Sequence, residues 1–248
     1  MNDQKSFQGF ILINKPAGIT SAQALNRLKR VLPKKIKVGH AGTLDTFATG
    51  LLVVGITRPA TRLLRYMSLS DKQYQATGLF GLLTDTLDKR GNIIMQKDAI
   101  SFSFQQISET LSIFKNGYKQ IPPVYSALKY QGERLSDYAR AGKLTEEMQK
   151  IVAQKSRDIT LHKLEVVSVK ESFFSINAHV SHGTYIRSLI YDIAQALGSY
   201  ATTMSLQRTA IGPFSLDDAI KISDLTKDTV KNVIISIDEI IKKINPPK

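Results

Sequence analysis

Apolar residues form several runs along the chain that predict β-strands. Residues 9–14 ("GFILIN") predict a short apolar strand that runs into a Pro/Gly turn. Residues 51–56 ("LLVVGI") are almost continuously apolar, which is typical of a buried strand. Other segments alternate apolar and polar residues or are otherwise strand-like: 71–81 ("DKQYQATGLFG"), 157–169, 173–180 and 202–214.

Helical spacing of apolar residues predicts helices between these strands. Leu25, Leu28 and Leu32 share one face of residues 21–32, and Thr20 or Ser21 can cap that helix. The further helical segments are residues 58–67, a capped helix after Ser103, residues 184–197 with Gly198 as the stop, and a final segment ending near residue 243. Because strands and helices mix without regular alternation, the sequence predicts an α+β fold and not a doubly wound sheet.

Composition narrows the possible partners. The chain has 248 residues, of which 42% are hydrophobic, and we expect residues 1–248 to form a single domain. Lys and Arg number 34 against 21 Asp and Glu, a formal net charge of +13 that favours a polyanionic partner such as nucleic acid. No apolar run approaches the roughly 18 residues of a membrane span, and the start lacks a signal-peptide pattern. The sequence therefore predicts a cytoplasmic protein without a membrane partner.

Cofactor signals are missing from the sequence. With no cysteine and four histidines, we expect no metal site and no thiol chemistry. Neither GxxxxGK[ST] nor GxGxxG occurs, so a nucleotide cofactor is not expected either.

Asp45 is the sharpest candidate for chemistry. It lies in "GHAGTLDTFATG", whose other residues carry no second carboxylate, so an ionised Asp45 needs hydrogen bonds or a cation from elsewhere in the chain. The alternative is a turn residue or a helix N-cap beside the neighbouring glycines.

Three further residues could complete such a site, and each has a structural alternative. Arg187, at a glycine-marked junction of strand and helix, could pair with Asp45 or be an ordinary surface arginine. Tyr74 could be a platform for a base or could simply pack in its strand. His40 could contact a phosphate or base, or could brace the loop.

The segment at about 124–152 differs from the rest of the chain in composition. It is rich in basic and aromatic residues, among them Tyr125, Lys129, Tyr130, Arg134 and Arg140. We interpret this segment as an exposed, basic insertion that bears aromatic residues.

Several segments, in their order along the chain, resemble the TruB family of tRNA pseudouridine-55 synthases. They are "LINKPAGITS", "GHAGTLDTFATGLL", "DKQYQATGLFG" with "TDTLDKRG", "IPPVYSALKYQGERLSDYAR", and "HVSHGTYIRSLIYDIAQALG" followed by "LQRTAIGPF". The resemblance extends from about residue 8 to residue 240, and the ordered set is far more specific than any one segment.

The resemblance implies a pseudouridine synthase fold, with a mixed, largely antiparallel central sheet, flanking helices and loops, and a central active-site cleft. It implies a monomeric enzyme without cofactor that converts uridine 55 in the T loop of tRNA to pseudouridine. Asp45 matches the family's nucleophile and Arg187 the arginine that pairs with it. Tyr74 matches the tyrosine that stacks on the target base and is a candidate for proton abstraction.

The remaining substrate contacts follow from the same resemblance. His40 matches the histidine that contacts the RNA and helps the target nucleotide leave the stack, and Tyr185 and Leu206 match further pocket positions. The chain differs from the family's usual pattern in two respects. Thr46 replaces the usual proline after the acid, and we expect no C-terminal RNA-binding PUA domain.

Several mechanisms and two rival functions stay open. The carboxylate could add to uracil C6, add to ribose C1′, or abstract the ribose 2′ proton to form a glycal. A non-catalytic RNA-binding protein would explain the charge but gives Asp45 and Arg187 no reason to meet. A base-excising glycosidase could use an acid beside an arginine, but it would have to admit water and release free base.

Overall fold

The computed structural model describes residues 5–97, 100–126 and 128–244, which fold into two compact units. Unit 1 comprises residues up to Tyr74 together with those from Gln207 onward, and unit 2 comprises Gln75–Leu206. Two strands, β4 (Lys72–Phe80) and β13 (Ala201–Ile211), pass from one unit into the other.

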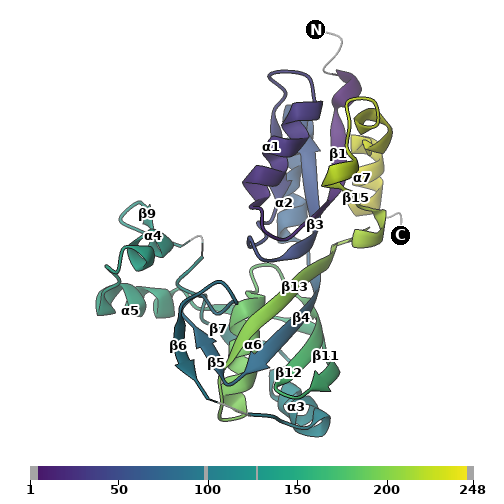
Figure 1. The fold of residues 1–248 in the computed structure, drawn as a ribbon. Helices are drawn as coiled ribbons and strands as arrows, with labels where there is room; N and C mark the ends of the chain where they lie inside the picture. The colour runs from purple at the N-terminus through teal and green to yellow at the C-terminus, as the bar shows by residue number, and fades with distance from the viewer. Residues whose placement is uncertain (1–4, 98–99, 127, 245–248) are drawn as a thin grey trace. The chain divides into compact units, whose positions relative to one another are not determined.

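Unit 1 is built on strands covered on both faces (Figure 1). Its sheet has the order β13-β3-β1-β15, and β2 also pairs with β3. The strands are β1 (Gly9–Lys15), β2 (Val38–Ala41), β3 (Thr49–Ile56), β14 (Phe214–Ser215) and β15 (Ile220–Lys221). The longer helices are α1 (Ser21–Val31), α2 (Thr57–Leu69) and α7 (Ile237–Ile244), and the 3-10 turns are η1 (Lys5–Phe7), η3 (Leu216–Asp218), η4 (Ile222–Asp224) and η5 (Val230–Val233).

The continuous apolar character of β1 and β3 follows from this packing. Side chains alternate between the two faces of a strand, and Ile11 and Ile13 pack in a core with Leu28 of α1. Phe10 and Leu12 point the other way and pack in a second core that includes α2 and α7 residues. The predicted strand at 9–14 and the predicted buried strand at 51–56 are confirmed, as β1 and β3.

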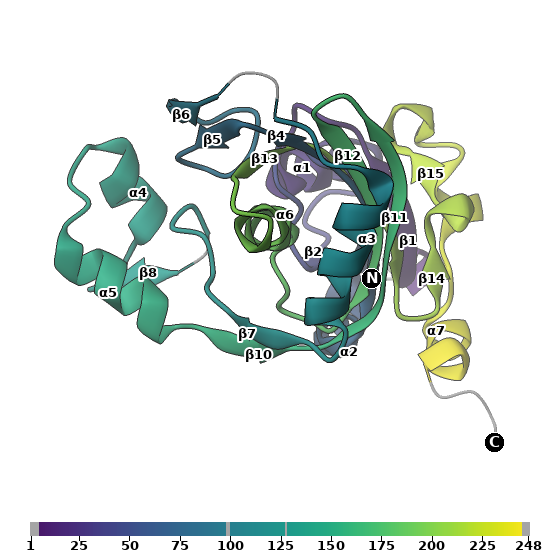
Figure 2. The same cartoon turned by 90° about the horizontal axis from the view of Figure 1, so that it is seen from below.

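Unit 2 has the strand order β11-β12-β4-β13, with α3 and α6 inside the curve of the sheet (Figure 2). Its strands are β5 (Leu82–Thr84), β6 (Ile93–Gln96), β7 (Tyr118–Gln120), β8 (Lys129–Tyr130), β9 (Glu133–Arg134), β10 (Arg157–Ile159), β11 (Leu161–Lys170) and β12 (Phe173–Val180). The helices are α3 (Phe104–Leu111), α4 (Leu135–Arg140), α5 (Glu146–Gln154) and α6 (Ile186–Ala196), with the 3-10 turn η2 (Ser112–Phe114). Gly78 of β4 allows α6 to come close, because a Cβ there would lie 2.9 Å from Cγ2 of Ile190.

The α+β fold class is confirmed. Pairing between the described strands is mostly antiparallel, while β1 pairs in parallel with β15 and β3 with β13. The predicted final helix ends close to where we expected, as α7. The chain before α7 is different: residues 216–233 form β15 and 3-10 turns.

Candidate functional site

Asp45 lies in the loop between β2 and β3. The amide N–H of Ala48 donates to the Asp45 carbonyl at 3.1 Å, which closes a turn around the acid. Leu44, Phe47 and Ala48 are buried while Asp45 is half-exposed. The apolar neighbours therefore anchor the loop and leave the carboxylate side accessible.

Lys15, at the end of β1, holds the base of this loop. Its ammonium donates to the carbonyls of Ala48 at 2.6 Å, Pro16 at 2.9 Å and Ile19 at 2.9 Å, and the residue is fully buried. Burial lowers the pKa of Lys15 to about 8, the Asp45 carboxylate acts in the opposite direction, and the Arg208 charge lowers it further. Lys15 thus joins the end of the Asp45 loop, at Ala48, to the segment that follows β1.

Arg208 of β13 spans the same loop from its other end. The guanidinium donates through Nε to the Leu51 carbonyl at 2.9 Å and through Nη2 to the Gly42 carbonyl at 3.0 Å, and the residue is 1% exposed. Gly42 has φ +69°, and a Cβ there would lie 3.3 Å from Nη1 of Arg208. Glycine is therefore favoured at this position by backbone conformation and by the close arginine.

The segment that follows β1 makes further contacts with the loop. The Ser21 hydroxyl accepts from the Leu44 amide at 3.0 Å, and the amide of Gly18 donates to the Thr46 carbonyl at 2.8 Å. Thr46, which stands where proline is usual in the resembling family, thus uses its carbonyl to join the two segments.

His40 and Tyr74 lie in the same unit as Asp45. His40 is on β2, half-exposed, and its Nδ1 is buried without a hydrogen-bond partner among the described residues. Burial and the Arg208 charge lower the pKa of His40, so its imidazole is neutral at neutral pH. Tyr74 is buried on β4, two residues from Lys72, whose pKa burial lowers to about 8.

Arg187 lies in the first turn of α6, in unit 2. It is 4% exposed and donates to the carbonyls of Thr86 at 2.6 Å and Tyr125 at 2.8 Å. Its Nη1 is also 3.9 Å from Oδ2 of Asp88. These contacts exclude the alternative of an ordinary surface arginine.

Tyr185 and Leu206 lie in unit 2 as well. Tyr185 is the residue before α6, and both of its backbone polar groups bond to the Gln120 side chain. Leu206 is buried on β13.

The predicted site residues therefore fall into two sets. Asp45, His40 and Tyr74 belong to unit 1, while Tyr185, Arg187 and Leu206 belong to unit 2. The pairing of Asp45 with Arg187 stays a prediction.

Sequence reasoning missed the buried cations Lys15 and Arg208. Both lie in segments that carry the family resemblance, "LINKPAGITS" and "LQRTAIGPF". The available signal for Lys15 was its position at the end of an almost continuously apolar strand. Nothing in the local pattern of 202–214 marks Arg208 as buried.

The predicted insertion has a small core of its own. Leu135, Met148 and Val152 are buried together, with partly buried neighbours that include Tyr130 and Tyr138. Ala127 lies outside the described residues. Figures 1 and 2 show α4 and α5 beyond the ends of β7 and β10, which connect this segment to the rest of unit 2.

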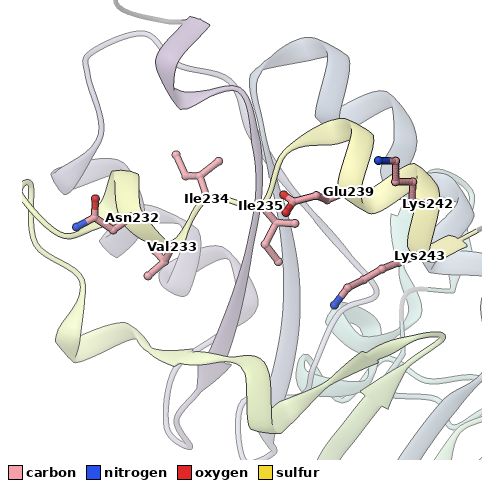
Figure 3. A pocket seen from close by; sticks show the side chains of 7 residues that line it. All are labelled: Asn232, Val233, Ile234, Ile235, Glu239, Lys242 and Lys243. Carbon is pink, nitrogen blue, oxygen red and sulfur yellow. The ribbon is translucent and has the colours of Figure 1, made fainter.

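A hollow of about 490 Å³ lies elsewhere in unit 1, beside α7 (Figure 3). It is lined by Asn232, Val233, Ile234, Ile235, Glu239, Lys242 and Lys243. Since it contains none of the predicted site residues, we do not assign it to the reaction. Among the described residues, no cluster of three or more His, Cys, Asp or Glu could hold a metal ion, and no helix is long and apolar enough to cross a membrane.

Comparison with known proteins identifies the family. Residues 29–186 match the sequence model of the TruB family pseudouridylate synthase N-terminal domain. The chain belongs to the TruB family. As a member of this family it is an isomerase with the pseudouridine synthase fold.

Named relatives cover most of this TruB family protein. The tRNA pseudouridine synthase B of Bordetella avium is 41% identical over 235 residues, covering 94% of this chain and 93% of that protein. The tRNA pseudouridine synthase B of Thermosipho melanesiensis is 37% identical over 233 residues, covering 94% of this chain and 73% of that protein. One chain of the crystal structure of a Cbf5-Nop10-Gar1 complex has the same fold, with a TM-score of 0.71 at 24% identity, over 98% of this chain and 64% of that chain.

Proposed function

We propose that this TruB family protein converts uridine 55 in the T loop of tRNA to pseudouridine, with Asp45 as the nucleophile. Relatives at 37% and 41% identity are named tRNA pseudouridine synthase B, which supports tRNA as the substrate. The net charge of +13 suits a polyanion of this kind.

One observation carries the assignment of Asp45. Its loop is held from both ends by two buried cations, Lys15 and Arg208, which donate hydrogen bonds to loop or flanking carbonyls. A structural turn residue would not need such support, whereas a nucleophile must be held in place before the substrate arrives.

The proposed reaction is an isomerisation that needs no cofactor. The bond from uracil N1 to ribose C1′ breaks, the base turns in the pocket, and C5 forms a new bond to the same C1′. The C5 proton is released, and N1 gains a proton. Asp45 can serve by attack on C6, by attack on C1′, or by abstraction of the 2′ proton.

The other site residues receive roles in binding the extruded base. Tyr74 stacks on it and is a candidate for the abstraction of the C5 proton. Tyr185 and Leu206 enclose it, and His40 contacts the RNA beside it. Arg187 forms an ion pair with Asp45 in this proposal.

The insertion at about 124–152 closes over the T-arm stem-loop in this proposal. Its small core makes it a folded element that can move as a body on its two connecting strands. We infer a monomer that acts on tRNA in the cytoplasm.

The test is an assay that separates three reaction classes. The protein is incubated with a T-arm stem-loop that carries uridine labelled with tritium at C5, and tritium in water and free uracil are both measured. We expect tritium release without free uracil. Free uracil would indicate a base-excising glycosidase, and RNA binding with neither product would indicate a non-catalytic binding protein; either result would refute the proposal.

A further inference from the structure

Two residues at the root of the insertion contact Tyr185. Gln120 is the last residue of β7, before the insertion, and Arg157 is the first residue of β10, after it. The two residues are paired directly across the antiparallel ladder. The strands that lead into and out of the insertion therefore meet at Tyr185.

The Gln120 side chain hydrogen-bonds to both the amide and the carbonyl of Tyr185. Its Oε1 accepts from the Tyr185 amide at 2.8 Å, and its Nε2 donates to the Tyr185 carbonyl at 3.1 Å. The same Nε2 lies 2.9 Å from Oη of Tyr118, and Gln120 is 1% exposed. Tyr185 is the N-cap residue of α6 and its own side chain makes no capping hydrogen bond, so the Gln120 side chain provides the hydrogen bonds to the backbone at this helix start.

Arg157 contacts the same tyrosine from the other strand. Its guanidinium lies over the Tyr185 ring, 5.4 Å from the ring centre. Gly183 leaves room for this side chain, since a Cβ there would lie 2.8 Å from Nη1 of Arg157. Backbone and ring of Tyr185 are thus held by separate residues of the root.

The connection extends into the first turn of α6. The Ser188 hydroxyl donates to the Ile121 carbonyl at 3.0 Å, and Arg187 donates to the Tyr125 carbonyl at 2.8 Å. Ile121 follows Gln120 directly along the chain, and Tyr125 lies five residues after Gln120. The entry to the insertion and the turn that carries Arg187 are therefore joined at several points.

We propose that Gln120 is a positioning residue for the isomerisation. Together with Arg157, Gln120 sets the positions of Tyr185 and Arg187 and couples these positions to the insertion. This proposal rests on the proposed function, because it assumes that Tyr185 and Arg187 act on the uridine. Closure of the insertion on RNA would then act on the residues that hold the base.

The test compares Gln120→Ala and Gln120→Glu with the wild-type protein in single turnover, with enzyme in excess over the tritiated T-arm stem-loop. Gln120→Glu keeps the size and the acceptor but removes both donors, so it tests the contact if Gln120→Ala folds poorly. We expect the rate constant at saturating enzyme to fall by about 10-fold or more, since a 1 Å misplacement can cost about 10²-fold, with RNA affinity changed less than about 3-fold. Gln105→Ala, which removes an exposed glutamine of α3, is the matched control and should keep the wild-type rate.

If Gln120 only stabilised the fold, the single-turnover experiment would give a different result. Partial unfolding lowers the active fraction but leaves the saturated rate constant of the folded molecules unchanged, and that outcome would overturn the proposal. Arg157→Ala combined with Gln120→Ala should slow the reaction less than the product of the two separate factors, because both act through Tyr185. If the two substitutions slowed the reaction independently, the proposal that Gln120 and Arg157 act together through Tyr185 would be overturned. Absence of tritium release in the wild-type protein would instead refute the proposed function itself.

Discussion

The ammonium group of Lys15 donates to three backbone carbonyls, and its burial makes the stability of the protein depend on pH. Burial lowers its pKa to about 8 in the folded protein, against 10.5 for an unperturbed lysine. Between about pH 8 and 10.5 the unfolded chain therefore binds more protons at this residue than the folded protein does. The contribution of Lys15 to the free energy of unfolding rises with pH across that window.

The prediction compares the wild-type protein with Lys15→Met in urea unfolding from pH 7 to 11. The difference in the free energy of unfolding, wild type minus variant, should increase as pH rises from about 8 to 10.5. Lys72→Met should show the same trend, because burial also lowers the pKa of Lys72 to about 8. A difference that stays constant over the whole range would contradict the burial of a charged lysine below the Asp45 loop.

At the level of single residues, Asp45 could be identified as a candidate from the sequence, but the buried cations Lys15 and Arg208 that hold its loop could not. Asp45 stands out because its neighbours carry no competing charge, which is visible in the sequence. The contacts of Lys15 and Arg208 depend on segments far apart in the chain, with Arg208 bonding to Gly42 across 166 residues. Local patterns cannot reveal contacts of this range.

At the level of elements, capping residues gave the most reliable boundaries. Thr20 accepts from the Gln23 amide and Ser103 from the Gln106 amide, and both helices begin with a full capping box. Ser21, the other candidate cap, bonds to Leu44 of the Asp45 loop instead. Residues 216–233 were harder to predict because 3-10 turns and a two-residue strand have little periodicity of their own.

The insertion provides a prediction at the same scale. Its exposed trypsin sites at Lys129, Arg134 and Arg140 should be cleaved more slowly when a T-arm stem-loop is bound, because closure on RNA would cover them. Cleavage products identified by mass spectrometry measure this directly, and an RNA hairpin of equal length with a different loop serves as control. Unchanged cleavage in the presence of T-arm RNA would count against the proposed closure.

At the level of the whole chain, positive charge is unevenly distributed. Residues 1–74 contain twelve Lys and Arg against three Asp. The exposed cations of this part lie on η1, α1, α2 and the segment after α1: Lys5, Arg27, Lys29, Arg30, Lys34, Lys35, Lys37, Arg58, Arg62 and Arg65. Such a surface suits the phosphate backbone of RNA.

The charge predicts a strong effect of salt on RNA affinity. Between 50 and 200 mM salt, we expect affinity for tRNA to fall by about 10³-fold, the value for about six phosphate contacts. Titrations of fluorescently labelled tRNA at several salt concentrations measure this slope. A nearly flat dependence would show that the positive surface is not used for RNA.

The central claim is that Asp45 is the nucleophile of an RNA isomerase, and Asp45→Asn tests it most directly. The variant keeps the size of the side chain but removes the carboxylate, so the loop and its hydrogen bonds to Lys15 and Arg208 should persist. Asp218→Asn makes the same change at an exposed position and serves as control. We expect Asp45→Asn to bind the T-arm stem-loop but to release no tritium from C5, while Asp218→Asn reacts like the wild-type protein. Full tritium release by Asp45→Asn would show that Asp45 is not the nucleophile.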